Sequence, residues 1–96
     1  MKLSHTEFEQ LARTHETAED HVKLAAHFNS HAEEHENDAK LHEELADHIA
    51  GHHGLAEAGL AGEERHYAAH SREAAEAMRN LARIHETLAQ RHRVRA

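Results

Sequence analysis

The 96-residue sequence contains 14 histidines, no cysteine and no proline, and its formal net charge is −7 when the histidines are neutral. The absence of cysteine excludes disulfides, thiolate metal sites and cysteine nucleophiles, and the acidic balance argues against nucleic acid as a partner. No segment has the hydropathy of a membrane span or of a signal peptide. We therefore expect a cytoplasmic protein, or a periplasmic one if a signal peptide has been removed.

The first predicted element is a short helix over about residues 4–16. Ser4 and Glu7 have the spacing of a capping box, in which each side chain accepts a hydrogen bond from the other residue's backbone. The apolar pattern changes phase near residues 14–17, and Thr17 with Asp20 resembles a second, weaker capping box. We expect a break here, and one continuous helix over residues 4–50 is the alternative.

Two long helices are predicted after this break, over residues 18–50 and 63–94. All four glycines fall within residues 51–62, which we expect to form a loop, with Gly51 ending the first long helix. Both tracts follow a 3.5-residue period. The sequence therefore predicts one all-α domain over residues 1–96, built as an antiparallel helical hairpin.

The large apolar side chains are too few for an obvious monomeric core. Nineteen of the 37 hydrophobic residues are alanine, and Leu, Ile, Val and Phe together number 15. Because a two-helix hairpin leaves its apolar stripe half-covered, we expect it to pair into a four-helix-bundle homodimer. The predicted inward columns are His21, Phe28, His35, His42 and Ile49; Leu24, His31, Asp38 and Leu45; Tyr67, Ala74, Leu81 and Leu88; and His70, Ala77 and Ile84.

The spacing of the histidines suggests metal binding. His27, His31 and His35 are each four residues apart, so in a helix they lie on one face. The expected hairpin register, in which facing residue numbers sum to about 116, brings His85 opposite His31. Unpaired polar groups in a core cost about 1–3 kcal/mol each, and a shared cation would offset that loss. We therefore predict a central site of His31, His35 and His85, with Asp38 and His27 beside it.

Two further groups of candidate ligands lie toward the two ends of the hairpin. The group nearer the loop consists of His42, His66 and His70, with Glu63, His48 and His52 within reach. The group at the opposite end consists of His15, His21 and His92. Pairs of imidazoles four residues apart on a helix can bind one ion, and a facing helix can supply further ligands.

Imidazole with some carboxylate favours Cu²⁺ or Zn²⁺, with Ni²⁺ or Co²⁺ as further candidates. Many ligands without a recognisable reaction centre favour sequestration, storage or transport of metal ions over catalysis, so we do not expect an enzyme. Two alternatives remain open at this stage. One is a haem-binding bundle with two histidine ligands, and the other is a pH-responsive interaction module without metal.

Overall fold

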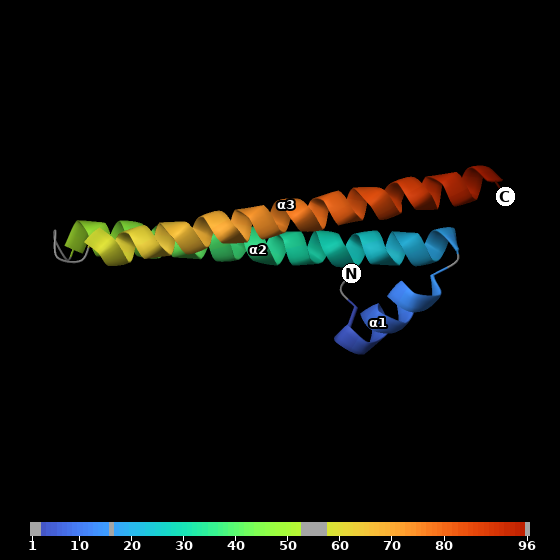
Figure 1. Cartoon of the computed structure of the whole chain (residues 1–96), viewed down its shortest axis with the longest axis horizontal. Coiled ribbons are helices and arrows are strands. Elements are labelled where there is room, and N and C mark those ends of the chain that lie inside the picture. Colours follow the sequence, from blue (N-terminus) through green and yellow to red (C-terminus); the bar gives the residue numbers. More distant parts are fainter. Residues whose placement is uncertain (1–2, 16, 53–57, 96) are drawn as a thin grey trace. The chain divides into compact units, whose positions relative to one another are not determined.

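The computed structural model of the chain describes residues 3–15, 17–52 and 58–95, and the regular secondary structure of this part is entirely helical. They are α1 (His5–Thr14), α2 (Ala18–His52) and α3 (Ala58–Arg95). Helices α2 and α3 run in opposite directions and pack against each other as a hairpin (Figure 1). The predicted all-α hairpin and its short N-terminal helix are thus confirmed.

Reciprocal side-chain caps separate α1 from α2. The Glu7 amide donates to Ser4 Oγ at 3.2 Å, and the Ser4 amide donates to the Glu7 carboxylate at 3.4 Å. The same pattern recurs at the start of α2, where the Asp20 amide donates to Thr17 Oγ1 at 3.1 Å and the Thr17 amide donates to Asp20 Oδ2 at 3.3 Å. Because each cap satisfies backbone donors at a helix start, the chain breaks between them. The alternative of one continuous helix is wrong.

The glycine segment contains more helix than predicted. Gly51 lies within α2, while Gly59 and Gly62 lie within α3, which begins five residues earlier than expected. A Cβ added at any of these three glycines would meet no atom within 4 Å. These are open helical positions, so Gly51 does not end the helix as predicted. Residues 53–57 of the expected loop lie outside the described residues.

Alanines form the contact surface between the two long helices. Each of these alanines is at most 4 % exposed, and they recur every seven residues: Ala25, Ala32, Ala39 and Ala46 on α2, and Ala61, Ala68, Ala75, Ala82 and Ala89 on α3. Helices approach more closely when the side chains at their contact are small. The larger residues beside this alanine seam are therefore displaced toward its edges.

The alanine seam corrects the predicted core. Four large apolar residues of the expected inward columns, Leu45, Tyr67, Leu81 and Ile84, are exposed, and so are Asp38, His70 and Ala77 of the same columns. His31, His35 and His42 are only half-buried. Every buried side-chain nitrogen and oxygen atom among the described residues has a hydrogen-bond partner. The expected cost of unpaired polar groups in the core therefore does not arise.

The chain packs as two compact units, each containing part of α2 and part of α3. The first unit comprises Met1–Ala32 and Ala77–Ala96, and the second comprises Glu33–Glu76. In the first unit the register differs from the predicted one by three residues of α3. The ring of Phe28, expected opposite Leu88, stacks on His85 with 5.7 Å between centroids. The expectation of one domain over residues 1–96 stays a prediction.

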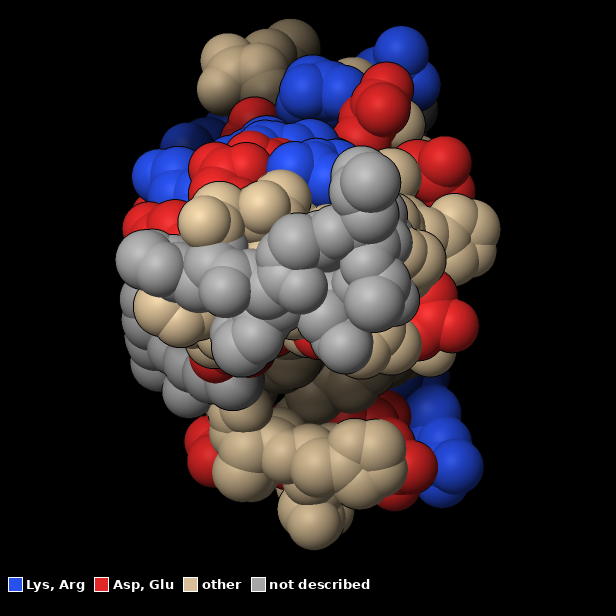
Figure 2. Space-filling model, turned by 90° about the vertical axis from the view of Figure 1, so that its left-hand side faces the viewer, with Lys and Arg blue, Asp and Glu red and all other residues tan. Residues whose placement is uncertain are grey.

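Ion pairs connect the two helices across the surface of the second unit. Arg72 pairs with Glu43, and an Arg65 guanidinium nitrogen lies 3.3 Å from Asp47 Oδ1. In the view from the end at which α2 ends and α3 begins, Lys and Arg side chains lie next to Asp and Glu side chains on the upper part of the face (Figure 2). Such exposed pairs contribute only about 0–1 kcal/mol each. The alanine seam is therefore the main helix–helix contact.

Candidate metal-binding site

Four imidazoles from three helical segments gather in the first unit. His15 is the C-cap residue of α1, His21 lies in the first turns of α2, and His85 and His92 lie seven residues apart on α3. The break between α1 and α2 allows His15 and His21 to approach each other, because the chain changes direction between them. We call these four residues the histidine cluster.

The rings of the histidine cluster are in mutual contact. His21 Nδ1 lies 2.8 Å from His85 Nδ1, and these two rings are stacked with 5.1 Å between centroids. The centroid of His21 is also 4.9 Å from that of His15 and 5.1 Å from that of His92. His21 is therefore the central member of the cluster.

Burial and the neighbouring rings favour the neutral imidazoles of His21 and His85. His21 is only 2 % exposed. Burial lowers the pKa of His21, as do the neighbouring His15 and His92, while Asp20 acts in the opposite direction. Burial likewise lowers the pKa of His85, with His21 and His15 adding to the effect. A metal ion binds neutral imidazole, so the environment of His21 and His85 favours the form of these two rings that can act as a ligand.

A backbone contact determines the tautomer of His15. Its Nδ1 lies 2.8 Å from the Ala12 carbonyl oxygen. A carbonyl oxygen can only accept, so Nδ1 carries the proton and Nε2 of the neutral ring keeps its lone pair. Histidines that bind metals commonly donate their other ring N–H to a carbonyl in this way.

The spacing of the cluster is compatible with one ion, but the ring orientations are not yet those of a bound site. Two imidazoles on a tetrahedral Zn²⁺, with Zn–N bonds of about 2.0–2.1 Å, have centroids roughly 5 Å apart. The observed separations from His21 match that value. The planes of His21 and His85, however, differ by only 24°. Among the described residues no group of three or more His, Asp or Glu side chains is already arranged to hold a metal ion, so the rings would have to rotate.

The residues of the predicted central site are distributed differently. His85 belongs to the histidine cluster, and His31 packs against His27 with 4.5 Å between ring centroids. His35 and Asp38 belong to the second unit, where Asp38 accepts a 2.8 Å hydrogen bond from Ser71 Oγ.

His27 has the opposite tautomer to His15. The Leu3 backbone amide donates to His27 Nδ1 at 3.3 Å, so in the neutral ring the proton lies on Nε2. Neither nitrogen then presents a free lone pair to a metal. His27 is buried and its ring stacks on Phe8 at 4.5 Å, a position that ties α1 to α2.

The predicted group nearer the loop divides into an ion pair and a histidine pair. His42 Nδ1 lies 2.5 Å from a Glu64 carboxylate oxygen, and His42 Nε2 lies 3.4 Å from Asp38 Oδ2. The hydrogen bond with Glu64 raises the pKa of His42, with a further contribution from Asp38. His66 Nε2 and His70 Nε2 are 3.1 Å apart on the exposed face of α3. Within this group, His66 and His70 bring two imidazole nitrogens close together.

The three other candidates of the same group are His48, Glu63 and His52. His48 and Glu63 are exposed, on α2 and α3 respectively. The side chain of His52 lies outside the described residues, so its predicted role stays a prediction.

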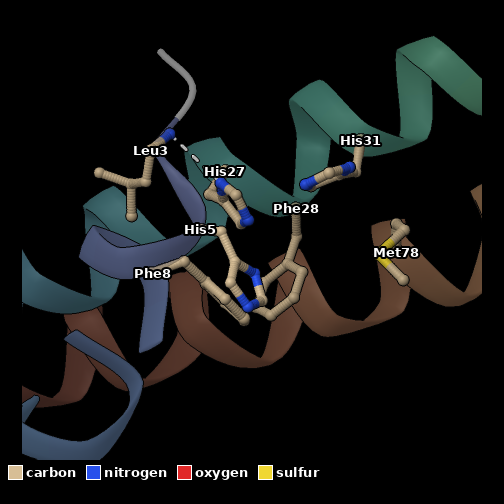
Figure 3. A pocket seen from close by; sticks show the side chains of 7 residues that line it. All are labelled: Leu3, His5, Phe8, His27, Phe28, His31 and Met78. Atoms are coloured by element: carbon tan, nitrogen blue, oxygen red, sulfur yellow. Dashed lines mark hydrogen bonds between the residues drawn. The ribbon is translucent and has the colours of Figure 1, made fainter. Parts of the chain in front are cut away.

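A pocket that sequence reasoning did not identify lies beside the histidine cluster in the first unit. Its volume is about 380 Å³, and its lining comes from all three helices and the segment before α1. The lining residues, drawn in Figure 3, are Leu3, His5, Phe8, His27, Phe28, His31 and Met78. The sequence contained one usable signal, which is that Leu3 and Phe8 flank the capping box with the spacing of a hydrophobic staple.

Comparisons with other proteins give no family for this chain: no family model, curated protein or solved structure matches it. Within the described residues no helix combines the length and hydropathy needed to cross a membrane.

Proposed function

We propose that this chain binds divalent transition-metal ions for sequestration, storage or transport, with the histidine cluster as its principal site. The observation that carries the proposal is the 2.8 Å separation of His21 Nδ1 and His85 Nδ1, with His15 and His92 beside them. Cu²⁺ and Zn²⁺ fit an all-imidazole ligand set best, followed by Ni²⁺ and Co²⁺.

The contact between His21 and His85 holds two ring nitrogens where one metal ion could take the place of the hydrogen bond between them. Two neutral rings with Nδ1 atoms at 2.8 Å share one proton between two nitrogens. A metal ion bound to both Nδ1 atoms would replace this hydrogen bond by two coordinate bonds once the rings rotate, and the shared proton would move to Nε2 of its own ring, so that both imidazoles stay neutral. His15 already has its Nε2 lone pair available, which supplies a third donor from another segment.

The location of the cluster suggests what a bound ion would do to the fold. His15 follows α1, His21 lies on α2, and His85 lies on α3, so one ion would cross-link three helical segments. The first unit has few large buried apolar side chains: Leu24 is fully buried, and Leu3 is 7 % exposed. Binding free energy from the metal would therefore add directly to the stability of this unit.

The histidine pair on α3 is proposed as a second, weaker site. His66 and His70 are one helical turn apart, and their Nε2 atoms are 3.1 Å apart. Two imidazoles from a single exposed helix face give bidentate binding without cross-linking. We expect this site to have lower affinity than the histidine cluster, because it has fewer ligands and more competition from water.

The chain is also proposed to act as a homodimer. In the second unit four large apolar side chains are between 42 % and 57 % exposed, namely Leu41, Leu45, Leu60 and Tyr67. A second copy covering this surface would complete a four-helix arrangement. Light scattering should give twice the chain mass in metal-free buffer, and the mass of a single chain would refute the homodimer without affecting the metal proposal.

Titration calorimetry on metal-free protein without a histidine tag tests the metal proposal. The key variant is His85→Phe, because a phenyl ring preserves the stacking on Phe28 while removing both nitrogens. We expect Zn²⁺ affinity at the principal site to fall at least 100-fold. The matched control is His5→Phe, since His5 is exposed on α1 outside the cluster. Equal affinity in wild type and His85→Phe would overturn the assignment.

The second site is distinguished in the same experiment. The His66→Ala, His70→Ala double variant should lose the weaker binding event and retain the stronger one. Circular dichroism on each variant checks that the helices remain formed. Absence of any Zn²⁺, Cu²⁺, Ni²⁺ or Co²⁺ binding to the wild-type chain would refute the proposed function.

A further inference from the structure

The histidine pair on α3 supplies only half of the ligands of a tetrahedral metal site. His66 Nε2 and His70 Nε2 are 3.1 Å apart. Two nitrogens bound to one tetrahedral Zn²⁺, with Zn–N bonds of about 2.0–2.1 Å, are roughly 3.3 Å apart, so the observed spacing fits two of the four positions. Within the described part of the chain no third His, Asp or Glu side chain completes this group. The two remaining positions are therefore open to ligands from another molecule.

The pair lies on the outer face of α3. Ala68, a member of the alanine seam, is midway between the two histidines in the sequence and faces α2. Two residues correspond to about 200° of rotation around a helix, so both imidazoles lie on the side of α3 opposite the seam. His66 and His70 are accordingly exposed, and 62 % of the His70 side-chain surface is accessible. A second protein molecule can therefore reach both rings.

The potential ligands on this face have the same spacing in both directions along the helix. Glu63 precedes His66 by three residues and Glu73 follows His70 by three, so the order is Glu, His, His, Glu. A two-fold interface brings the same surface of two copies together, so that each residue of one copy meets its counterpart on the other. In an antiparallel arrangement of two α3 helices, His66 of each copy lies opposite His70 of the other. Two copies together thus supply four imidazoles.

The charges on this face favour the contact between copies only when a cation is present. The nearby Arg65 and Arg72 of α3 are directed toward α2, where each pairs with a carboxylate. Glu63 and Glu73 are exposed, and two facing copies place four carboxylates beside the imidazoles. These carboxylates repel one another without a metal ion and are attracted to a metal ion bound between them. The association is therefore expected to depend on metal.

We propose that one divalent transition-metal ion joins two copies of this chain through His66 and His70 of each copy. This inference rests on the second metal site of the proposed function and adds a second copy as the source of the two missing ligands. In the metal-free pair one Nε2 donates its proton to the other. On metal binding that proton moves to Nδ1 of its own ring, so both imidazoles bind as neutral ligands. Glu73 Oε2, which lies 3.9 Å from His70 Nδ1, stabilises a proton there.

Light scattering during addition of Zn²⁺ to the metal-free wild-type chain tests this proposal. We expect the mass to at least double relative to the metal-free protein and to return to its starting value when a chelator is added. Titration calorimetry should give one ion per two chains for the weaker binding event. An unchanged mass with a weaker event of one ion per chain would overturn the bridge and leave the second site of the proposed function intact. Absence of the weaker event would refute both.

Three variants identify the ligands of the bridge. The His66→Ala, His70→Ala double variant should keep its metal-free mass when Zn²⁺ is added. His48→Ala removes an exposed histidine of α2 in the same unit and is the matched control, which should associate as the wild type does. His85→Phe should also associate, because the histidine cluster is not part of the bridge. Zn²⁺-dependent association of the double variant, or its loss in His48→Ala, would overturn the assignment. Circular dichroism before addition of Zn²⁺ checks that each variant is helical.

Discussion

Substituting leucine into the alanine seam tests the closeness of the two long helices. Ala68 is 2 % exposed on α3, and Ala69 beside it on the same helix is exposed. Ala68→Leu adds three carbon atoms where the facing helix leaves no room for them, and such overpacking costs about 1–3 kcal/mol. The same change at Ala69 points into solvent, where substitutions stay within about 0.5 kcal/mol.

Thermal unfolding followed by circular dichroism measures this difference. For a domain of this size, each kcal/mol changes Tm by about 4–8 °C, so Ala68→Leu should lower Tm by roughly 5–20 °C. Ala69→Leu should change it by no more than about 4 °C. If Ala68→Leu raised Tm, or if both variants behaved alike, the alanines would not be the close contact between the helices. The exposed leucines would then have to be reconsidered as the core.

Three further predictions follow from particular residues. Gly62→Ala should raise stability by about 0.4–1 kcal/mol in thermal unfolding, because a Cβ there meets no atom within 4 Å and alanine restricts the unfolded chain; a loss of stability would contradict the helical position. Ser4→Ala should cost α1 about 1 kcal/mol and accelerate amide exchange in residues 5–14, and unchanged exchange would argue against the cap. The lowered pKa values of His21 and His85 mean that the unfolded chain takes up protons first, so Tm of the metal-free protein should fall as pH drops from about 6.5 to 5.5. His42 has the opposite effect on Tm, because hydrogen bonding to Glu64 raises its pKa. Its contribution to stability is present below pH 6.5 and is lost as the pH rises. A Tm that rises on acidification would show that the burial of His21 and His85 does not dominate.

Local sequence signals located the helices well, because caps act over a few residues. Ser4 with Glu7 and Thr17 with Asp20 form the reciprocal hydrogen bonds that their spacing predicts. The glycine-rich segment was harder to interpret, since glycine is compatible with both loop and helix. Its outer parts extend the helices instead of ending them.

Which side chains face the other helix was predicted less well, because a 3.5-residue period identifies a stripe of a helix but not which column of that stripe lies at the closest contact. Leu45 and Tyr67 were expected inside, yet the backbones approach through the alanines and leave these larger side chains exposed. Close contact through small residues leaves no strong hydropathy signal. The sequence evidence for this contact is the recurrence of alanine at seven-residue intervals in both tracts.

The histidine cluster depends on which residues of α2 lie opposite which residues of α3. The predicted register differs here, and it therefore led to a different set of ligands. Shifting the register by three residues moves His85 from the expected His31 toward His21 and Phe28. One sequence feature does relate to the observed cluster. The similar segments LARTHET and LARIHET place His15 and His85 at equivalent positions, and both side chains belong to the cluster.

The proposed metal site is tested most directly by nuclear magnetic resonance of the imidazole nitrogens during addition of Zn²⁺ to metal-free protein. If the cluster binds one ion, the ring-nitrogen resonances of His15, His21, His85 and His92 should shift together. Their shifts should be complete before those of His66 and His70, the exposed histidine pair on α3. The bonded nitrogen of His15 should be Nε2, because its Nδ1 proton is held by the Ala12 carbonyl. Unchanged His21 and His85 nitrogens at Zn²⁺ saturation would contradict the account.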